Sequence, residues 1–195
     1  MSCDLLPTEQ PGNHYQGDVR DVLYENWDMV IAHPPCTFLS VAGNRWFNEE
    51  RYGDKALRRK SERVAAVNFF KIFTDINCEK VAIENPIGFM SNAYQKPDQI
   101  IHPYFFGDPE RKATCLWLKG LEKLVPTNIV QPEIITYKNG KGTDSPWHLN
   151  SLSLPAEERR KVRSKTFQGV ADAMASQWGG NIQQKEQQDL FEVAV

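Results

Sequence analysis

A short apolar run that ends at two consecutive prolines constrains the fold of this chain more than any other stretch. Residues 29–32 are apolar without polar alternation, which is typical of a strand buried on both faces. His33, Pro34 and Pro35 follow, and the chain must leave the sheet there because proline lacks a backbone N–H and fixes φ. Cys36 is therefore predicted just beyond the carboxyl end of a strand, at the edge of an open α/β sheet where ligands bind.

The surroundings of Cys36 leave two interpretations open. Thr37 and Ser40 place hydroxyl groups near the thiol, whereas a cysteine without chemical function is usually packed among aliphatic side chains. One interpretation is a reactive thiol in a ligand-binding site. The other is a structural turn at two prolines with an incidental buried cysteine.

A second apolar run, residues 81–83, ends in the same way at Glu84, Asn85 and Pro86. If the two predicted strands are parallel neighbours, Cys36 and Glu84 leave the sheet at the same edge and converge on one pocket. The alternative for Glu84 is a solvated charge at a strand end. The apolar run leads directly into this carboxylate without a polar transition, which favours the pocket.

These stretches resemble the two catalytic signatures of the DNA cytosine-5 methyltransferases, in which Pro35-Cys36 would follow one strand and Glu84-Asn85 a later one. The wider resemblance is to the small phage-type cytosine methyltransferase-like proteins. It rests on residues 3–9, 14–19, 32–37, 83–86, 114–118 and 173–179. The resemblance implies an S-adenosylmethionine-dependent transferase with a Rossmann-like α/β fold, in which helices flank a mostly parallel sheet.

The implied reaction is methyl transfer from S-adenosylmethionine to C5 of cytosine in DNA. That carbon is a poor nucleophile until a thiolate adds at C6 and makes an enamine, which is the function that the resemblance gives to Cys36. Glu84, protonated or sharing a proton with ring N3, would stabilise the adduct, and Asn85 would orient it. A free thiol has a pKa of roughly 8.5, so polar or positive neighbours are expected around Cys36. In duplex DNA the base must first leave the stack.

The resemblance also implies the cofactor contacts. Asp4 follows a short predicted strand and is placed to accept ribose hydroxyls, as acidic residues do in nucleotide-binding folds. Asp18 would contact the adenine, and Pro34 and Pro35 would line the same site. The alternative for both aspartates is a loop position in which the carboxylate accepts from its own backbone.

Three basic residues are candidates for substrate contacts. Arg45 lies in an irregular segment beside Trp46 and Phe47, a loop suited to closing over a planar base by stacking. The two aromatic residues could equally pin this loop to the core. Arg111 and Lys112 precede a strand predicted over residues 113–118, and the resemblance makes them the candidates for contact with the base or its phosphate.

Parts of the family pattern are expected to be missing. The glycine-rich turn that cradles the methionine end of the cofactor, and the central first strand before it, would both lie ahead of Asp4. The target-recognition domain of the family is expected to be absent or reduced to residues 87–150. Glu-Asn-Pro also replaces the commoner Glu-Asn-Val, which keeps the carboxylate and alters the turn.

The length of 195 residues fits one α/β domain, predicted over residues 1–180, and a flexible polar tail over residues 181–195. A net charge of -2 indicates no overall basic surface, so any DNA contact must be local. The four cysteines lack C-x-x-C spacing, which predicts neither a metal site nor a disulfide framework. This favours a reducing cytoplasm, and under the resemblance that of a phage-infected or lysogenic bacterium. No signal peptide or membrane-spanning run is recognised.

The predicted tail contains a segment that resembles the short peptide by which many bacterial and phage proteins bind the DNA sliding clamp. Its candidate contacts are Gln187, Leu190 and Phe191. Leu190 and Phe191 would be apolar anchors offered by a flexible segment. The sequence carries no signal for an oligomeric state.

The remaining elements are predicted from periodicity and capping. A helix over residues 54–75 would connect the two buried strands as a β-α-β unit, and residues 87–110 would form a long functional loop. The core-facing residues of the helix over residues 54–75 are expected to be Leu57, Val64, Val67, Phe70 and Phe73. Later helices are predicted to begin near Ser153 and near Gly169, the second ending at Gly179-Gly180.

Three other functions are consistent with parts of the pattern. An amino-methyltransferase also has Pro-Pro after a strand but requires Asn or Asp before it and an aromatic residue after it, where this chain has His33 and Cys36. A non-catalytic protein could keep the fold to bind a nucleotide, DNA or a host partner. A hydrolase could pair Cys36 with His33, His102 or His148, although no spacing favours one histidine.

Overall fold

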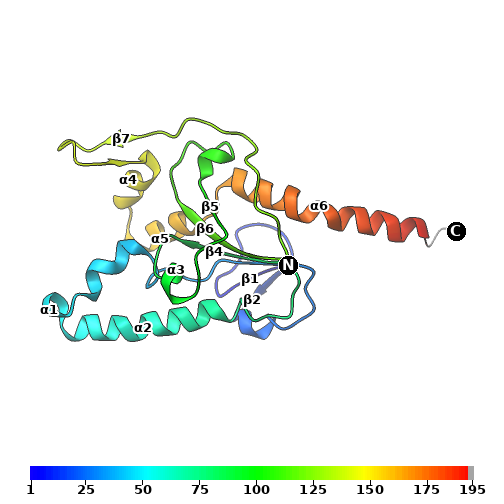
Figure 1. Cartoon of the computed structure of the whole chain (residues 1–195), viewed down its shortest axis with the longest axis horizontal. Helices are drawn as coiled ribbons and strands as arrows, with labels where there is room; N and C mark the ends of the chain where they lie inside the picture. The colour runs from blue at the N-terminus through cyan, green and yellow to red at the C-terminus, as the bar shows by residue number, and fades with distance from the viewer. Residues whose placement is uncertain (193–195) are drawn as a thin grey trace.

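A four-stranded sheet with the order β3-β4-β6-β5 forms the centre of the molecule (Figure 1). Its strands are β3 (Val30–Ala32), β4 (Val81–Pro86), β5 (Gln99–Ile101) and β6 (Thr114–Lys119). The structure, a computed structural model, describes the backbone of residues 1–192 and the side chains of residues 1–180.

The directions of the strands confirm one prediction and correct another. β3 pairs with β4 in parallel, with Ala32 opposite Ile83, as predicted. β4 does not end at Glu84, however, but continues through Pro86 as the partner of β6. β6 runs antiparallel to both β4 and β5. The sheet is therefore mixed rather than mostly parallel, although β3, β4 and β5 all point the same way.

Two smaller sheets lie outside this one. β1 (Ser2–Asp4) pairs in parallel with β2 (His14–Gln16), and neither joins the central sheet. β7 (Ile135–Thr136) and β8 (Thr143–Asp144) form an antiparallel hairpin.

Alternation along β4 separates two apolar cores. Val81 and Ile83 face the cluster that contains Phe70 of helix α2 (Asp54–Lys71), whereas Ala82 faces the cluster that contains Met174 of α6 (Gln168–Glu192). The sheet is thus covered on both faces, which explains why its central strands read as continuous apolar runs. The coarse α/β prediction is confirmed: helices flank a small mixed sheet.

Helix α2 buries a different stripe from the one predicted. Phe70 and Phe73 are buried, but Leu57 and Val64 are 52% and 61% exposed. The first half of α2 faces the loops after the strands rather than the sheet, and Arg59 and Arg63 occupy its inward positions there.

The remaining helices begin and end where local capping allows. They are α1 (Glu49–Tyr52), α3 (Met90–Ala93), α4 (Pro146–Leu152) and α5 (Ala156–Ser164), with 3-10 turns at η1 (Val19–Asp21), η2 (Val41–Phe47) and η3 (Pro103–Phe105). The predicted loop over residues 87–110 therefore contains α3, β5 and η3. Ser145 caps α4, a helix that the sequence analysis did not predict, by accepting from the backbone N–H of His148. The helix predicted from near Ser153 is α5, which begins at Ala156.

Helix α6 continues through the glycine pair at which it was predicted to stop. A glycine C-cap requires a positive φ, and neither Gly179 nor Gly180 adopts one. The side chains of Gln187, Leu190 and Phe191, the predicted clamp contacts, lie outside the described residues. Among the helices that the structure describes, none is long and apolar enough to cross a bilayer.

Candidate active site

The chain turns sharply at the end of β3 and presents Cys36 at the surface. The carbonyl oxygen of Cys36 accepts from the backbone N–H groups of Leu39 and Ser40, at 3.0 Å each, which closes a tight turn around the cysteine. Cys36 is exposed, whereas Cys3 is half-buried and Cys78 and Cys115 are buried. The Cys36 residue as a whole is therefore exposed, although protein atoms pack around its sulfur.

Two arginines of α2 hold the loop that follows. Arg59 donates from Nη2 to the carbonyl oxygen of Thr37 at 3.0 Å, and Arg63 donates from Nε to that of Phe38 at 2.9 Å. Both guanidinium groups also stack on the ring of Phe47, with Arg63 at 3.3 Å from the ring centroid. The basic run of α2 thus positions the cysteine loop instead of forming only a solvated face.

The end of β4 is tied to this loop at two points. Asn85, 1% exposed, donates from Nδ2 to the carbonyl oxygen of Pro34 at 2.7 Å. Farther along, Phe89 donates its backbone N–H to the carbonyl oxygen of Leu39 at 2.7 Å. This contact passes over Gly88, where an added Cβ would lie 2.0 Å from the same oxygen. Only glycine allows the two backbones to approach this closely.

Glu84 lies between these anchors, at the mouth of the edge that β3 and β4 form. Its side chain is 19% exposed, and Oε2 lies 3.2 Å from Nδ1 of His33. Glu84 also lines a cavity of about 20 Å³ together with Lys112, Thr114 and Phe167. A single water needs roughly 10–15 Å³, so a pyrimidine ring can bind here only if the lining moves or if the ring lies on the exposed side.

The Glu84 carboxylate and the Lys112 ammonium both affect the pKa of the Cys36 thiol, although Cys36 does not line the Glu84 cavity. Protein atoms packed around the sulfur raise the pKa of the Cys36 thiol, and the Glu84 carboxylate raises it further. A backbone hydrogen bond and the Lys112 ammonium act in the opposite direction without reversing the shift. The predicted positive neighbour is present, but the net effect of these surroundings disfavours the thiolate.

The three predicted substrate contacts lie in different places. Lys112 lines the Glu84 cavity and donates from Nζ to the carbonyl oxygen of Arg163 at 3.2 Å. Arg111 instead donates to Oγ1 of Thr143 in β8 at 2.9 Å.

Arg45 lies in η2, on an aromatic loop that is open to solvent. Its guanidinium stacks on Trp46 at 4.7 Å from the ring centroid, and Trp46 is 41% exposed. The Trp46 ring also lies 4.9 Å from that of Tyr52, centroid to centroid. Trp46 is therefore not pinned in the core and leaves part of its ring free.

The residues expected to hold S-adenosylmethionine are not assembled into a cradle. Asp4 accepts from the backbone N–H of Leu6 at 2.8 Å. Asp18 accepts from the backbone N–H and guanidinium of Arg20, and these hydrogen bonds lower the pKa of its carboxyl to about 2. Neither of these carboxylates lines the Glu84 cavity, and neither do the two prolines before Cys36. The expected cofactor contacts are therefore not brought together at the Glu84 cavity.

The histidines considered for a hydrolase do not support one. His33 contacts Glu84, and Nδ1 of His148 lies 2.6 Å from Oδ2 of Asp144. His102 packs on Tyr104. Within the described residues no histidine hydrogen-bonds to the Cys36 thiol, and no group of three or more His, Cys, Asp or Glu is placed to hold a metal ion.

Fold and site together define an α/β protein with an exposed cysteine and a carboxylate at one sheet edge. A scan against models of protein families finds no match, and a search of curated proteins finds none either.

Proposed function

We propose that this chain forms a covalent adduct between Cys36 and C6 of a cytosine base, as a DNA cytosine-5 methyltransferase-like protein using S-adenosylmethionine. The observation that supports this most is the convergence of Cys36, Glu84 and Lys112 at one sheet edge, where Asn85 and Gly88 hold the two loops together. The carboxyl ends of parallel strands are where open α/β sheets hold reactive groups.

The addition step needs two proton movements. The Cys36 thiol first loses its proton to solvent, and the sulfur then bonds to C6. The C5–C6 π electrons move to C4–C5, and those of C4–N3 take up a proton that Glu84 donates to N3. The product is an enamine whose C5 is nucleophilic, which is what transfer of a methyl group requires.

Protonation of Glu84 favours both the ionisation of the Cys36 thiol and the transfer of a proton to N3. The carboxylate raises the pKa of the Cys36 thiol, so a neutral Glu84 removes that opposition while Lys112 continues to favour the thiolate. A base whose N3 is hydrogen-bonded to protonated Glu84 would therefore favour ionisation of Cys36. The chemistry becomes available when the substrate is bound and is suppressed in the free protein.

The finer fold belongs to the same proposal. Three central strands point in one direction, and the separate parallel pair of β1 and β2 is consistent with a Rossmann-like methyltransferase fold that lacks one central strand. The resemblance implies S-adenosylmethionine as methyl donor. Because Asp4 and Asp18 are engaged within their own loops, we derive no step for the donor.

The second candidate is a binding protein of the same fold without catalysis. The raised pKa of Cys36, the small cavity beside Glu84 and the engagement of Asp18 by Arg20 favour it. DNA is the proposed partner in both cases, in a bacterial cytoplasm, with the sliding clamp reached through the tail.

Transfer of a labelled methyl group from S-adenosylmethionine to cytosine-containing DNA tests the proposal. We expect transfer by the wild type, none by Cys36→Ser, and wild-type transfer by Cys3→Ser, a matched change at a half-buried cysteine. If the wild type transfers no methyl group and binds no cofactor, the chain is instead the non-catalytic binding protein.

A further inference from the structure

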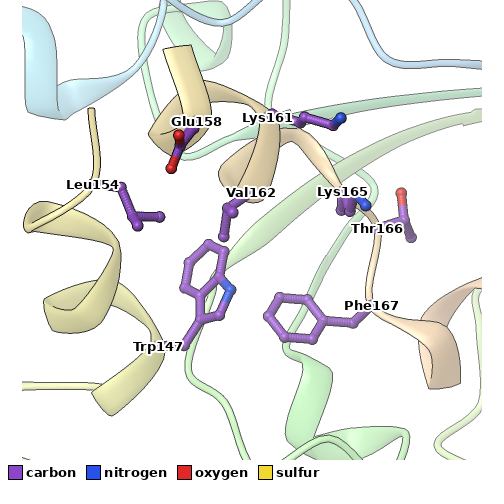
Figure 2. A pocket seen from close by; sticks show the side chains of 8 residues that line it. All are labelled: Trp147, Leu154, Glu158, Lys161, Val162, Lys165, Thr166 and Phe167. Atoms are coloured by element: carbon purple, nitrogen blue, oxygen red, sulfur yellow. The ribbon is translucent and has the colours of Figure 1, made fainter. Parts of the chain in front are cut away.

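A groove with a volume of about 380 Å³ lies between α4, α5 and the segment that leads into α6 (Figure 2). Its apolar walls are Trp147, Leu154, Val162 and Phe167, and Lys161 and Lys165 stand at its edge. This volume falls in the range of roughly 300–1,000 Å³ that small-ligand sites occupy. None of the sequence signals for catalysis pointed to it.

Two aromatic rings make one wall of the groove. The centroids of Trp147 and Phe167 lie 5.3 Å apart with the planes inclined by 59°, and both side chains are half-buried. Nζ of Lys112 lies 5.8 Å from each ring centroid. Lys112 and Phe167 also line the Glu84 cavity, so the groove begins beside the candidate active site.

The two lysines share one carboxylate. Lys161 and Lys165 both pair with Glu9, which lies in the loop between β1 and β2. These hydrogen bonds lower the pKa of Glu9. All three side chains remain largely exposed, at 63%, 62% and 46%, so the pairs are weak and exchangeable. The two ammonium groups thus converge on one carboxylate, that of Glu9.

We propose that the groove binds one nucleotide of single-stranded nucleic acid, with its base against Trp147 and Phe167 and its phosphate on Lys161 and Lys165 in place of Glu9. Aromatic rings beside lysines are the combination that binds unpaired nucleotides, since the ring stacks on the base and the ammonium groups pair with the backbone. An acidic peptide would use the lysines but would leave the aromatic wall unfilled.

The position of Glu158, the other charged residue of the groove, agrees with a phosphate placed on the lysines. Figure 2 shows Glu158 on the other side of the groove from Lys165. A phosphate is therefore drawn to the lysine side and repelled from the Glu158 side. Glu158 is left as an acceptor for an exocyclic amino group, the contact that carboxylates make with cytosine.

The test is binding of a fluorescein-labelled oligodeoxycytidine to the full chain, measured by anisotropy at several salt concentrations without a methyl donor. Its result is therefore independent of methyl transfer. Glu9→Gln removes the competing carboxylate and should tighten binding roughly 2- to 5-fold, the range expected for exposed ion pairs. The double change Lys161→Gln/Lys165→Gln should lower the slope of log K against log salt by about 0.7, the value for one neutralised phosphate of a single strand.

A change in the aromatic wall separates stacking from simple charge attraction. Trp147→Leu should weaken binding by roughly 5-fold or more, because one stacked base contributes about 1–3 kcal/mol. The double change Lys138→Gln/Lys141→Gln, at the exposed tip of the β7–β8 hairpin, is the matched control and should leave the affinity nearly unchanged.

Either of two results would overturn the proposal. In the first, Glu9→Gln leaves the affinity unchanged or weakens it, and Lys161→Gln/Lys165→Gln keeps the wild-type salt slope. The other is an oligoglutamate of equal charge that displaces the oligonucleotide as well as unlabelled oligodeoxycytidine does. Glu9 and both lysines are exposed, so these results stand even if Trp147→Leu fails to fold.

Discussion

Replacing Gly88 with alanine should separate the Cys36 loop from the Glu84 strand. The new Cβ would lie 2.0 Å from the carbonyl oxygen of Leu39 and 2.9 Å from its carbonyl carbon, whereas real Cβ contacts are almost never below 3.0 Å. Both atoms belong to the backbone, so no side-chain rotation relieves the overlap. The two loops must therefore move apart by about 1 Å.

That movement breaks the hydrogen bonds that join the loops. Phe89 N–H to Leu39 O, at 2.7 Å, and Val41 N–H to Ile87 O, at 3.2 Å, are the two backbone contacts at this point. Each contributes about 0.5–1.5 kcal/mol, so Gly88→Ala should lower the free energy of unfolding by about 1–3 kcal/mol.

Urea unfolding measures this loss, and methyl transfer or oligonucleotide adduct formation measures its effect on the site. Gly179→Ala is the matched control, because nothing lies within 4 Å of its added Cβ and it lies inside α6. That change should stabilise by up to about 1 kcal/mol. A Gly88→Ala protein with the wild-type urea midpoint and m value would refute the interlocked loops on which the site depends.

Two further predictions concern the same edge of the sheet. Glu84→Gln removes the carboxylate that raises the pKa of Cys36, so a thiol reagent should label Cys36 faster at pH 8 than in the wild type. Lys112→Met should slow the labelling, because it removes the charge that lowers this pKa; equal rates in all three proteins would contradict the convergence of these groups. Asn85→Ala leaves the carbonyl of Pro34 without its donor and should lower the free energy of unfolding in urea by about 1–3 kcal/mol. An unchanged midpoint would contradict this tie between the two loops.

The sequence predicts this edge well because its signals are local. An apolar run followed by two prolines places Cys36 just beyond β3, and this follows from a few consecutive residues. The same rule is wrong for the second run, because β4 continues through Glu84 to Pro86 along β6. Parallel pairing of the two strands was a hypothesis from the same pattern, and the fold confirms it. The antiparallel insertion of β6 depends on pairing between distant segments, which periodicity does not encode.

Residues that act through distant contacts were interpreted less well. Arg59 and Arg63 occupy inward positions of α2 because aromatic rings of the loops receive their guanidinium groups, although charge alone predicts a solvated face. Asn85 was expected to orient the substrate, but it is buried against the turn before Cys36. The groove at Trp147 joins three segments, and the sequence predicted the helices α5 and α6 but neither α4 nor the packing that brings the three together.

Exchange of the C5 hydrogen of cytosine with solvent tests the central claim most directly, because it requires the Cys36 adduct and no methyl donor. In heavy water the enamine takes deuterium at C5. Loss of the original C5 hydrogen as a proton, together with elimination of the sulfur from C6, then returns cytosine one mass unit heavier. The account predicts this mass gain in a cytosine-containing oligonucleotide with the wild type and with Cys3→Ser, but not with Cys36→Ser or Glu84→Gln. Equal exchange with and without the Cys36 sulfur, or none with any of these proteins, would contradict it.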